Sequence, residues 1–447
     1  TDQTDQTDQT DQTDQTDQVP INLPSALARI GGTHPIVGHA RWRVQEAYAQ
    51  LDRAEVLWLP SIQAGMNYHR HDGNYQAING SIVDINSNSL QAGFGAGAIA
   101  AGTTPRPGLS AQFHLADAIF LPKVAERNAW ARQHAALAAE NQLMLSAALA
   151  YVDLLDAYQE ESLFEESSNR LGGIAKITRD YARVGSGLVS DAQRMETEVS
   201  LVELRRLGAK ERKLSASTRL ARVLSIPTTS SLVPQDALVV PLELAEVDSP
   251  EYDQVLCGLV RRPELAESQA LVSAAKEAYA REKNAPLVPS ILLGFSTGGF
   301  GGGLGNQFGD WGGRYDIDAL MTWELRNMGL GEQAARRERQ AQIQQAMFNK
   351  IRWMDQVAQE ISEARVQVLV RREQLEVSDQ AVRTANDSYM KNLERIGQGQ
   401  GLPIEVLQSA QAMETSERAY LSTVSNYNRA QLQLLWAMGW CGIDFGG

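Results

Sequence analysis

The chain has 447 residues, of which 43% are hydrophobic and only 6% aromatic, and its formal net charge is −13. An acidic chain without basic clusters lacks the signature of nucleic-acid binding, so no nucleic acid is expected as a partner. The aromatic content is thin for one compact core and suits long helices. No apolar run is long enough for a transmembrane helix, which leaves a closed β-barrel as the expected route through a membrane.

The first residues carry no fold information. Residues 1–18 repeat Thr-Asp-Gln, a tract that has nothing to bury and is interpreted as disordered or non-native. No signal-peptide pattern is present, so we expect any secretory leader to have been removed.

The chain contains two cysteines, Cys257 and Cys441, far apart in sequence. A disulfide is possible in an oxidising compartment. Two isolated buried thiols are the favoured interpretation.

The sequence repeats one order of elements. His34-Pro35-Ile36 opens a predicted helix, and Leu59-Pro60-Ser61-Ile62 closes it. Arg262-Pro263-Glu264 and Val288-Pro289-Ser290-Ile291 do the same in the second half. Two strands and two long helices follow each time, so we predict a duplicated strand–strand–helix–helix unit. The copies cover residues 19–245 and 246–447.

The elements of each copy follow from hydrophobic periodicity and from helix-ending signals. In the first copy the helices are 36–58, 124–183 and 189–225, and the strands are 61–70 and 109–117. Residues 72–108 are polar and glycine-rich, so a long loop is predicted there. In the second copy the helices are 263–286, 330–396 and 403–438, and the strands are 290–297 and 314–325.

The strands alternate apolar and polar residues. Along 314–325 one face is apolar for about ten residues, the length of a transmembrane β-strand. We predict that the strand positions facing lipid are Met66, Tyr68, Phe113, Ile317, Met321 and Trp323. Four strands are too few to close a barrel, so three copies are expected to supply twelve.

The helix over 330–396 carries a hydrophobic residue at every seventh position. This heptad predicts a coiled-coil seam. Its members are Met347, Met354, Ile361, Val368, Leu375, Val382, Tyr389 and Ile396. At 1.5 Å per residue the helix would be about 100 Å long. Solvation and i,i+4 pairing explain the charged residues on its other faces.

Both long helices end on glycine, a common C-cap signal. Gly185 and Gly187 follow the first helix, and a glycine-rich stretch, 397–401, follows the second, so the second connection is expected to be longer. Asp191 and Glu405 lie in the first turns of the returning helices, where a carboxylate suits the positive helix end.

This ordered set of features resembles the TolC family of outer-membrane efflux proteins over about residues 22–440. Segments 400–408 and 426–434 carry the resemblance most clearly. The resemblance implies a mainly α homotrimer with a twelve-stranded membrane β-barrel continuous with a coiled-coil α-barrel. It implies a non-catalytic exit duct of a tripartite efflux pump or type I secretion system, with no cofactor. The duct would lie in the outer membrane, extend into the periplasm, and work with a periplasmic adaptor and an inner-membrane pump.

The same resemblance assigns roles at the tips of the helices. Asp191 and Glu405 would form the pore gate, with Arg395 as a partner of Asp191. Gln408 stands where some members have a second acidic residue, so the constriction is expected to be less negative. The adaptor would dock on the tips, at Gly185, Gly187, Leu188, Gly397, Gly399, Gly401, Leu402 and Pro403.

Other patterns do not indicate a chemical site. His69 and His71 form a His-x-His pair, but no nearby carboxylate or cysteine completes a metal site. Residues 298–305 lack the following helix of a phosphate loop and are interpreted as a flexible hairpin loop. Phe308 and Trp311 beside it could touch lipid headgroups or a partner. No nucleophile–base set or nucleotide motif indicates an enzyme.

One rival class stays open. A duplicated coiled-coil scaffold without transport, or a surface tube, could carry the same helices, and a sheet over a soluble core would alternate similarly. The behaviour of the purified protein without detergent separates these classes, because only a lipid-facing sheet demands detergent.

Overall fold

The computed structural model describes residues 18–31, 34–59, 63–96, 109–185, 187–236 and 238–441. The chain divides into two compact units. Unit 1 contains Thr1–Arg41, Ala135–Leu265 and Trp353–Gly447, and unit 2 contains Trp42–His134 and Ala266–Arg352. Each unit therefore combines residues from both halves of the chain. Within the described ranges, no helix is both long enough and apolar enough to cross a membrane.

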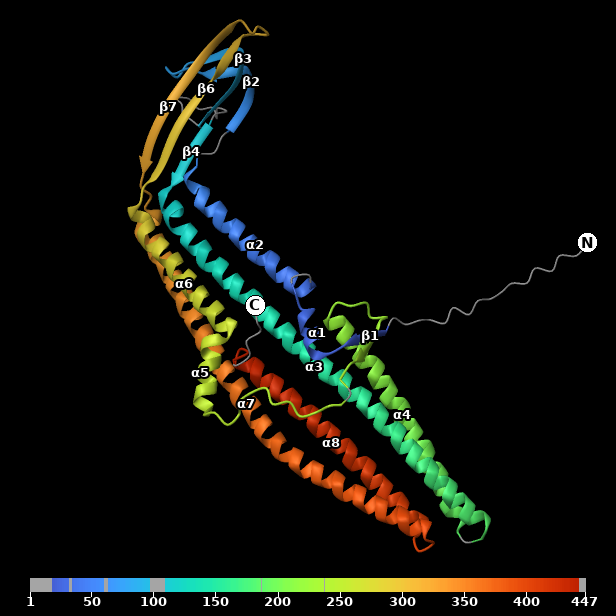
Figure 1. The fold of residues 1–447 in the computed structure, drawn as a ribbon. Coiled ribbons are helices and arrows are strands. Elements are labelled where there is room, and N and C mark those ends of the chain that lie inside the picture. Colours follow the sequence, from blue (N-terminus) through green and yellow to red (C-terminus); the bar gives the residue numbers. More distant parts are fainter. Residues whose placement is uncertain are drawn as a thin grey trace, which may run out of the picture. The chain divides into compact units, whose positions relative to one another are not determined.

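Unit 2 is built on an antiparallel sheet of five strands (Figure 1). The strands are β2 (Gln63–Gln76), β3 (Ile82–Ala96), β4 (Leu109–His114), β6 (Ser290–Leu304) and β7 (Asp310–Thr322). β3 and β4 pair one after the other along the same edge of β6, and β7 pairs along its other edge. β2 pairs with β3, so β2 and β7 are the outer strands of the sheet.

Two predicted loops are strands. The loop predicted over 72–108 is wrong, because β2 continues to Gln76 and β3 occupies Ile82–Ala96. β3 lacks a clean alternation, being rich in Asn, Ser and Gly, which have little intrinsic strand preference. The flexible loop predicted over 298–305 is also wrong, because β6 runs to Leu304. A Cβ at Gly298 would lie 2.3 Å from the carbonyl oxygen of Ala92, so glycine allows β3 and β6 to approach closely here.

Helices lead into and out of the sheet of unit 2. α2 (Pro35–Glu55) and α6 (Pro263–Asn284) each end in a short 3-10 turn before a strand. α3 (Leu115–Arg183) begins directly after β4, so Leu115, predicted within a strand, is helical. β7 ends at Thr322, and the connection to α7 (Leu330–Gly397) contains left-handed residues at Asn327 and Met328.

Unit 1 consists mainly of long helices. α3 returns through α4 (Val189–Val223), and α7 returns through α8 (Pro403–Ala437). The α7 heptad is buried at Ile361, Val368, Tyr389 and Ile396, but Met347 and Met354, at its start, are exposed. Smaller elements complete the fold: α1 (Leu23–Ala28), α5 (Glu251–Arg261), and β1 (Gln18–Ile21) paired in parallel with β5 (Ser231–Pro234).

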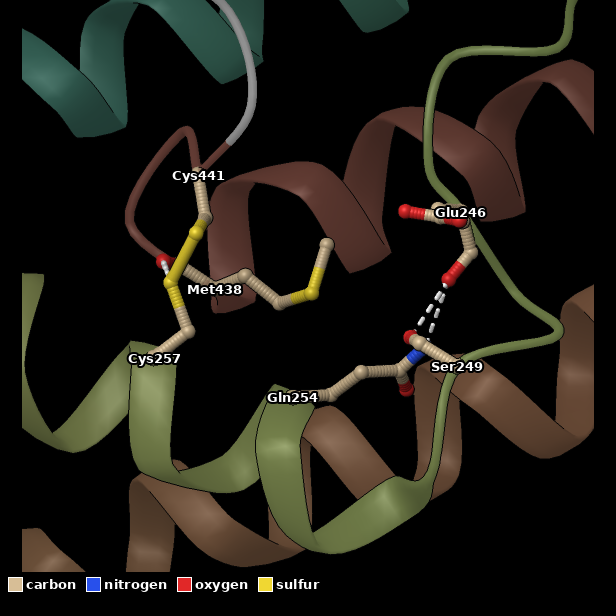
Figure 2. The surroundings of a disulfide bond; sticks show 6 residues. All are labelled: Glu246, Ser249, Gln254, Cys257, Met438 and Cys441. Atoms are coloured by element: carbon tan, nitrogen blue, oxygen red, sulfur yellow. Dashed lines mark hydrogen bonds between the residues drawn. A yellow bond between two sulfur atoms is a disulfide. The ribbon is translucent and has the colours of Figure 1, made fainter.

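The two cysteines form a disulfide, so the prediction of two isolated thiols is wrong (Figure 2). Their Cα atoms lie 6.7 Å apart, although 184 positions separate them in sequence. Left-handed residues at Gly439 and Trp440 turn the chain after α8 and bring Cys441 back onto α5. Gly258 lets α5 lie close to α7, since a Cβ at position 258 would be 2.4 Å from the side chain of Ile361 on α7. Sequence spacing could not reveal this proximity.

Candidate functional site

The sheet of unit 2 has one continuous apolar face, here called face A. In an antiparallel ladder, directly paired residues project to the same side. Tyr68 pairs with Leu90, Phe295 pairs with Ile317, and the strands between them keep this register. Face A therefore carries, among the described side chains, Met66, Tyr68, Leu90, Leu293, Phe295, Tyr315, Ile317 and Met321.

Face A is open in this chain. Met66 and Ile317 are each 74% exposed, and Tyr68 and Met321 are also exposed. A contiguous exposed apolar surface of this kind marks contact with a partner or with lipid. Trp323, another predicted lipid-facing residue, is exposed just beyond the end of β7. Position 113 pairs with Ile291, but the side chain of Phe113 lies outside the described residues.

Tryptophans mark both ends of the apolar band. Trp311, at the start of β7, and Trp323 are both exposed. Twelve residues of strand separate them, or about 40 Å at about 3.3 Å per residue, and a tilt of about 40° reduces this to about 30 Å. That height matches the hydrocarbon core of a bilayer with aromatic residues at both interfaces.

The opposite side, face B, is more polar over most of its length. His69 pairs with Ser89, and the His114 ring nitrogen Nδ1 lies 3.0 Å from the Ser290 hydroxyl oxygen. Leu320 is an apolar exception near the helix-connected end. In the part of the chain that is described, no three His, Cys, Asp or Glu side chains are grouped to hold a metal ion. A sheet apolar on one side and mostly polar on the other can separate lipid from water.

The two helical tips share one backbone geometry. Gly185 and Gly399 both have left-handed φ values, +77° and +73°. The Gly187 N–H donates to the carbonyl of Tyr181 at 3.0 Å, and the Gly401 N–H donates to that of Arg395 at 3.2 Å. The connections, residues 184–188 and 398–402, are equally long. The prediction of a longer second tip is therefore wrong, because Gly397 still belongs to α7.

The side chains at the tips differ between the halves. Arg395 forms an ion pair with Glu405 at 3.3 Å, within the second tip. Arg395 thus has an acidic partner within its own tip, and its predicted pairing with Asp191 stays a prediction. Asp191 occupies the position equivalent to Glu405, but its counterpart of Arg395 is Tyr181. Among the described residues, no side-chain partner of Asp191 is found, and Gln408 is exposed on α8.

Tyr181 connects the two tips. Its hydroxyl donates to the carbonyl oxygen of Ile396 at 2.9 Å, at the end of α7. Ile396 is buried in an apolar cluster shared by α3, α4, α7 and α8. The sequence showed Tyr181 only as a periodic hydrophobic residue, and no local signal indicated this contact.

Comparison with known proteins identifies the fold. Residues 258–440 match the family model of the outer membrane efflux protein. The similarity to this family model lies in the second half of the chain. No curated protein sequence matches the chain. The predicted mainly α fold with a small sheet is confirmed by the solved structures described next.

Several solved outer-membrane channels share the efflux-protein fold over nearly the whole chain. The outer-membrane channel OprN superposes with a TM-score of 0.77 at 15% identity, covering 93% of this chain and 89% of OprN. VceC from Vibrio cholerae superposes with a TM-score of 0.75 at 15% identity, covering 93% of this chain and 96% of VceC. CmeC from Campylobacter jejuni superposes with a TM-score of 0.77 at 16% identity, covering 93% of this chain and 85% of CmeC. The first half, which the family model does not reach, therefore has the same architecture.

Proposed function

We propose that this protein is the outer-membrane exit duct of a tripartite efflux pump or type I secretion system, a passive conduit opened at its tips. The observation that carries the proposal is the sheet of unit 2, whose exposed apolar face is bounded by Trp311 and Trp323. The same chain carries two long helical hairpins with matching glycine tips. The fold that the chain shares with solved outer-membrane channels contains both the sheet and the helical hairpins and supports the proposal.

A homotrimer accounts for the open sheet. Among the described strands, β2 and β7 are the outer ones, and each has one edge without a partner strand. Such edges are unstable in lipid, where every backbone group needs a partner. Three copies joined β2 to β7 around one axis would satisfy both edges, with face A toward lipid and face B toward the lumen. The lipid-facing positions are then Met66, Tyr68, Phe113, Ile317, Met321 and Trp323.

The tips would form the gate and the docking surface of a periplasmic adaptor. In a trimer, three copies of Asp191, Glu405 and Gln408 would surround the axis, and Arg395 would hold Glu405 in place. Because Asp191 has no partner among the described residues of its own chain, it is available to a neighbouring copy. The adaptor would contact Gly185, Gly187, Leu188, Gly397, Gly399, Gly401, Leu402 and Pro403, and an inner-membrane pump would supply the energy.

The channel proposal is tested on the purified full chain. In detergent, the mass of the protein component should be that of three copies, and insertion into planar bilayers should give discrete conductance steps. A monomer that stays in solution without detergent would instead support the scaffold without transport. Trimers in detergent that never conduct would also count against a channel.

The gate is tested separately. The double variant Asp191→Asn, Glu405→Gln should have a larger open-channel population, because it loses the carboxylate charges that are proposed to keep the tips closed. The control is Glu203→Gln, which neutralises an exposed carboxylate paired with Arg206 on α4 away from the tips. Equal conductance of the tip variant and the control would contradict the gate while leaving the channel intact.

A further inference from the structure

The β2–β3 hairpin extends beyond the rest of the sheet. β3 pairs with β6 only from Ser87 onward, whereas β2 and β3 remain paired up to Gln76 and Ile82. Residues 72–76 and 82–86 therefore form a two-stranded extension, here called the terminal ribbon, at the sheet end remote from the helices. Its turn is closed by a hydrogen bond from the Ala77 N–H to the carbonyl of Ser81 at 2.8 Å, and Gly80 supplies a φ of +84°.

The polarity of the hairpin inverts where the ribbon begins. Below this point, face A is apolar at Met66, Tyr68 and Leu90, and face B carries His69 and Ser89. Within the ribbon, the same register places mostly polar residues on face A: Asp72, Asn74, Gln76, Asp84 and Asn86. The exposed Ile82, which pairs with Gln76, is the apolar exception on this face. Face B of the ribbon carries Tyr75, Val83 and Ile85, of which Tyr75 is 51% exposed. One β-strand thus exposes apolar side chains on opposite faces at its two ends.

The second hairpin adds to this surface. Leu304 pairs with Ser87 and Phe300 pairs with position 91, which places both on face B, and both are exposed. The β6–β7 turn lies instead against residues of face A. Asn88 donates to the carbonyl of Gly305 at 2.8 Å, and the rings of Tyr68 and Phe308 are 6.1 Å apart. At the level of the inversion, the β6–β7 turn therefore lies on the face A side, whereas Phe300 and Leu304 on face B are exposed.

We propose that the apolar part of face B, Tyr75, Val83, Ile85, Phe300 and Leu304, packs against the same surface of two other copies and narrows the outer mouth of the channel. This inference rests on the proposed trimer. If face A of the sheet contacts lipid, face B points toward the common axis, and the ribbons lie at the end opposite the helices. Hydrophobic constrictions of this kind gate pores by excluding water.

A second copy fits this surface better than lipid. Lipid is excluded by position, because in the trimer face B lies on the lumen side of the sheet. The outward side of the ribbon carries the charged Asp72 and Asp84, as expected for a segment beyond the apolar band. The free edges of β2 and β7 already require copies on both sides, so the ribbon surface is continuous with the proposed interface.

Cross-linking tests the contact directly. Tyr75→Cys adds a third cysteine to a chain whose two natural cysteines are paired. With a short bismaleimide, the purified trimer should yield linked dimers on denaturing gels. The matched control, Asn74→Cys, places the thiol on the other face of the same ribbon and should stay monomeric. Trimers in which Tyr75→Cys links no better than Asn74→Cys would overturn the proposal and leave the channel itself standing.

Conductance gives an independent readout. Replacing Tyr75 and Val83 together with Asn should raise single-channel conductance, on the order of twofold, because water enters the constriction. Asn74→Ala, on face A, should leave it unchanged. If wild-type channels conduct and the double variant matches them, the ribbons do not narrow the mouth. If wild-type trimers do not conduct, the proposed function fails, and only cross-linking then decides the contact.

Discussion

The two halves of the chain agree at the tips of the helices and differ at the other end of unit 1. At the tips, both halves use a left-handed glycine, a second glycine two positions later, and the same backbone hydrogen bond. At the other end, the first half adds the parallel pair of β1 and β5, whereas the second half adds α5 and a disulfide. The tight turn between two helices therefore requires glycine at the same positions in both halves. The other end has no such shared requirement, and a strand pair stabilises it in the first half and a disulfide in the second.

The largest expected effect comes from the disulfide, which the first half lacks. Replacing Cys257 and Cys441 with Ser removes a cross-link between distant segments, which typically costs about 2–5 kcal/mol. The denaturation midpoint in detergent, followed by helical circular dichroism, should fall markedly. A reducing agent should produce the same fall in the wild type and none in the serine variant. Equal midpoints for oxidised and reduced wild type would show that this end does not depend on the cross-link.

Glycine substitutions test whether the tips are equivalent. Gly185→Ala and Gly399→Ala each force a left-handed residue with a side chain, at a cost of about 1–2 kcal/mol. Because the backbones match, the two midpoints should fall by similar amounts. Gly397→Ala is the control, since Gly397 is helical with open space around it, and alanine should be neutral or stabilising there. A large cost at one tip alone would contradict the equivalence.

Tyr181 tests the difference between the tips. Tyr181→Phe removes the hydrogen bond to the carbonyl of Ile396 and should cost about 1 kcal/mol, because that carbonyl lies beside a buried core. Tyr389→Phe is the matched control: Tyr389 lies in the same cluster, and among the described residues its hydroxyl has no hydrogen-bond partner. An equal loss in both variants would mean that Tyr181 acts only through its ring.

Periodicity predicted the helices because these elements are long and their burial repeats regularly. The returning helices, predicted over 189–225 and 403–438, are observed as Val189–Val223 and Pro403–Ala437. β3 was missed for a physical reason. Its apolar residues lie on both faces, Ile82 and Leu90 on face A and Val83 and Ile85 on face B, so no single alternation spans the strand.

The site was predicted in part. Alternation placed Met66, Tyr68, Ile317 and Met321 on one face, and the register shows them on face A. The ion pair at the second tip was not predicted, because the resemblance indicated Asp191 as the partner of Arg395 and only geometry shows that Arg395 contacts Glu405. The Cys257–Cys441 bond depends on α5 lying against the turn after α8, a contact between segments 184 positions apart that periodicity does not reveal.

The smallest expected effect is a pH dependence on the α3–α8 contact. Burial raises the pKa of Asp156, although the hydroxyl of Ser425, 2.6 Å away, and the nearby Arg429 oppose this. Between the ordinary pKa, about 4, and the raised value, the folded state binds the proton more tightly than the unfolded state. Stability from this group is therefore gained as pH falls through that window and lost as pH rises through it.

Comparing the wild type with Asp156→Asn across pH isolates this contribution. The denaturation midpoint of the wild type should gain on that of the variant as pH falls from neutral toward about 4, because only the wild type can take up the proton. Ser425→Ala provides the second arm. It removes a hydrogen bond that lowers the pKa of Asp156, so the wild-type gain should begin at a higher pH in that background. If the difference between the midpoints of the wild type and Asp156→Asn does not change with pH, the pKa of Asp156 is the same in the folded and unfolded states. Burial at the contact between α3 and α8 would then not disfavour the charged carboxylate.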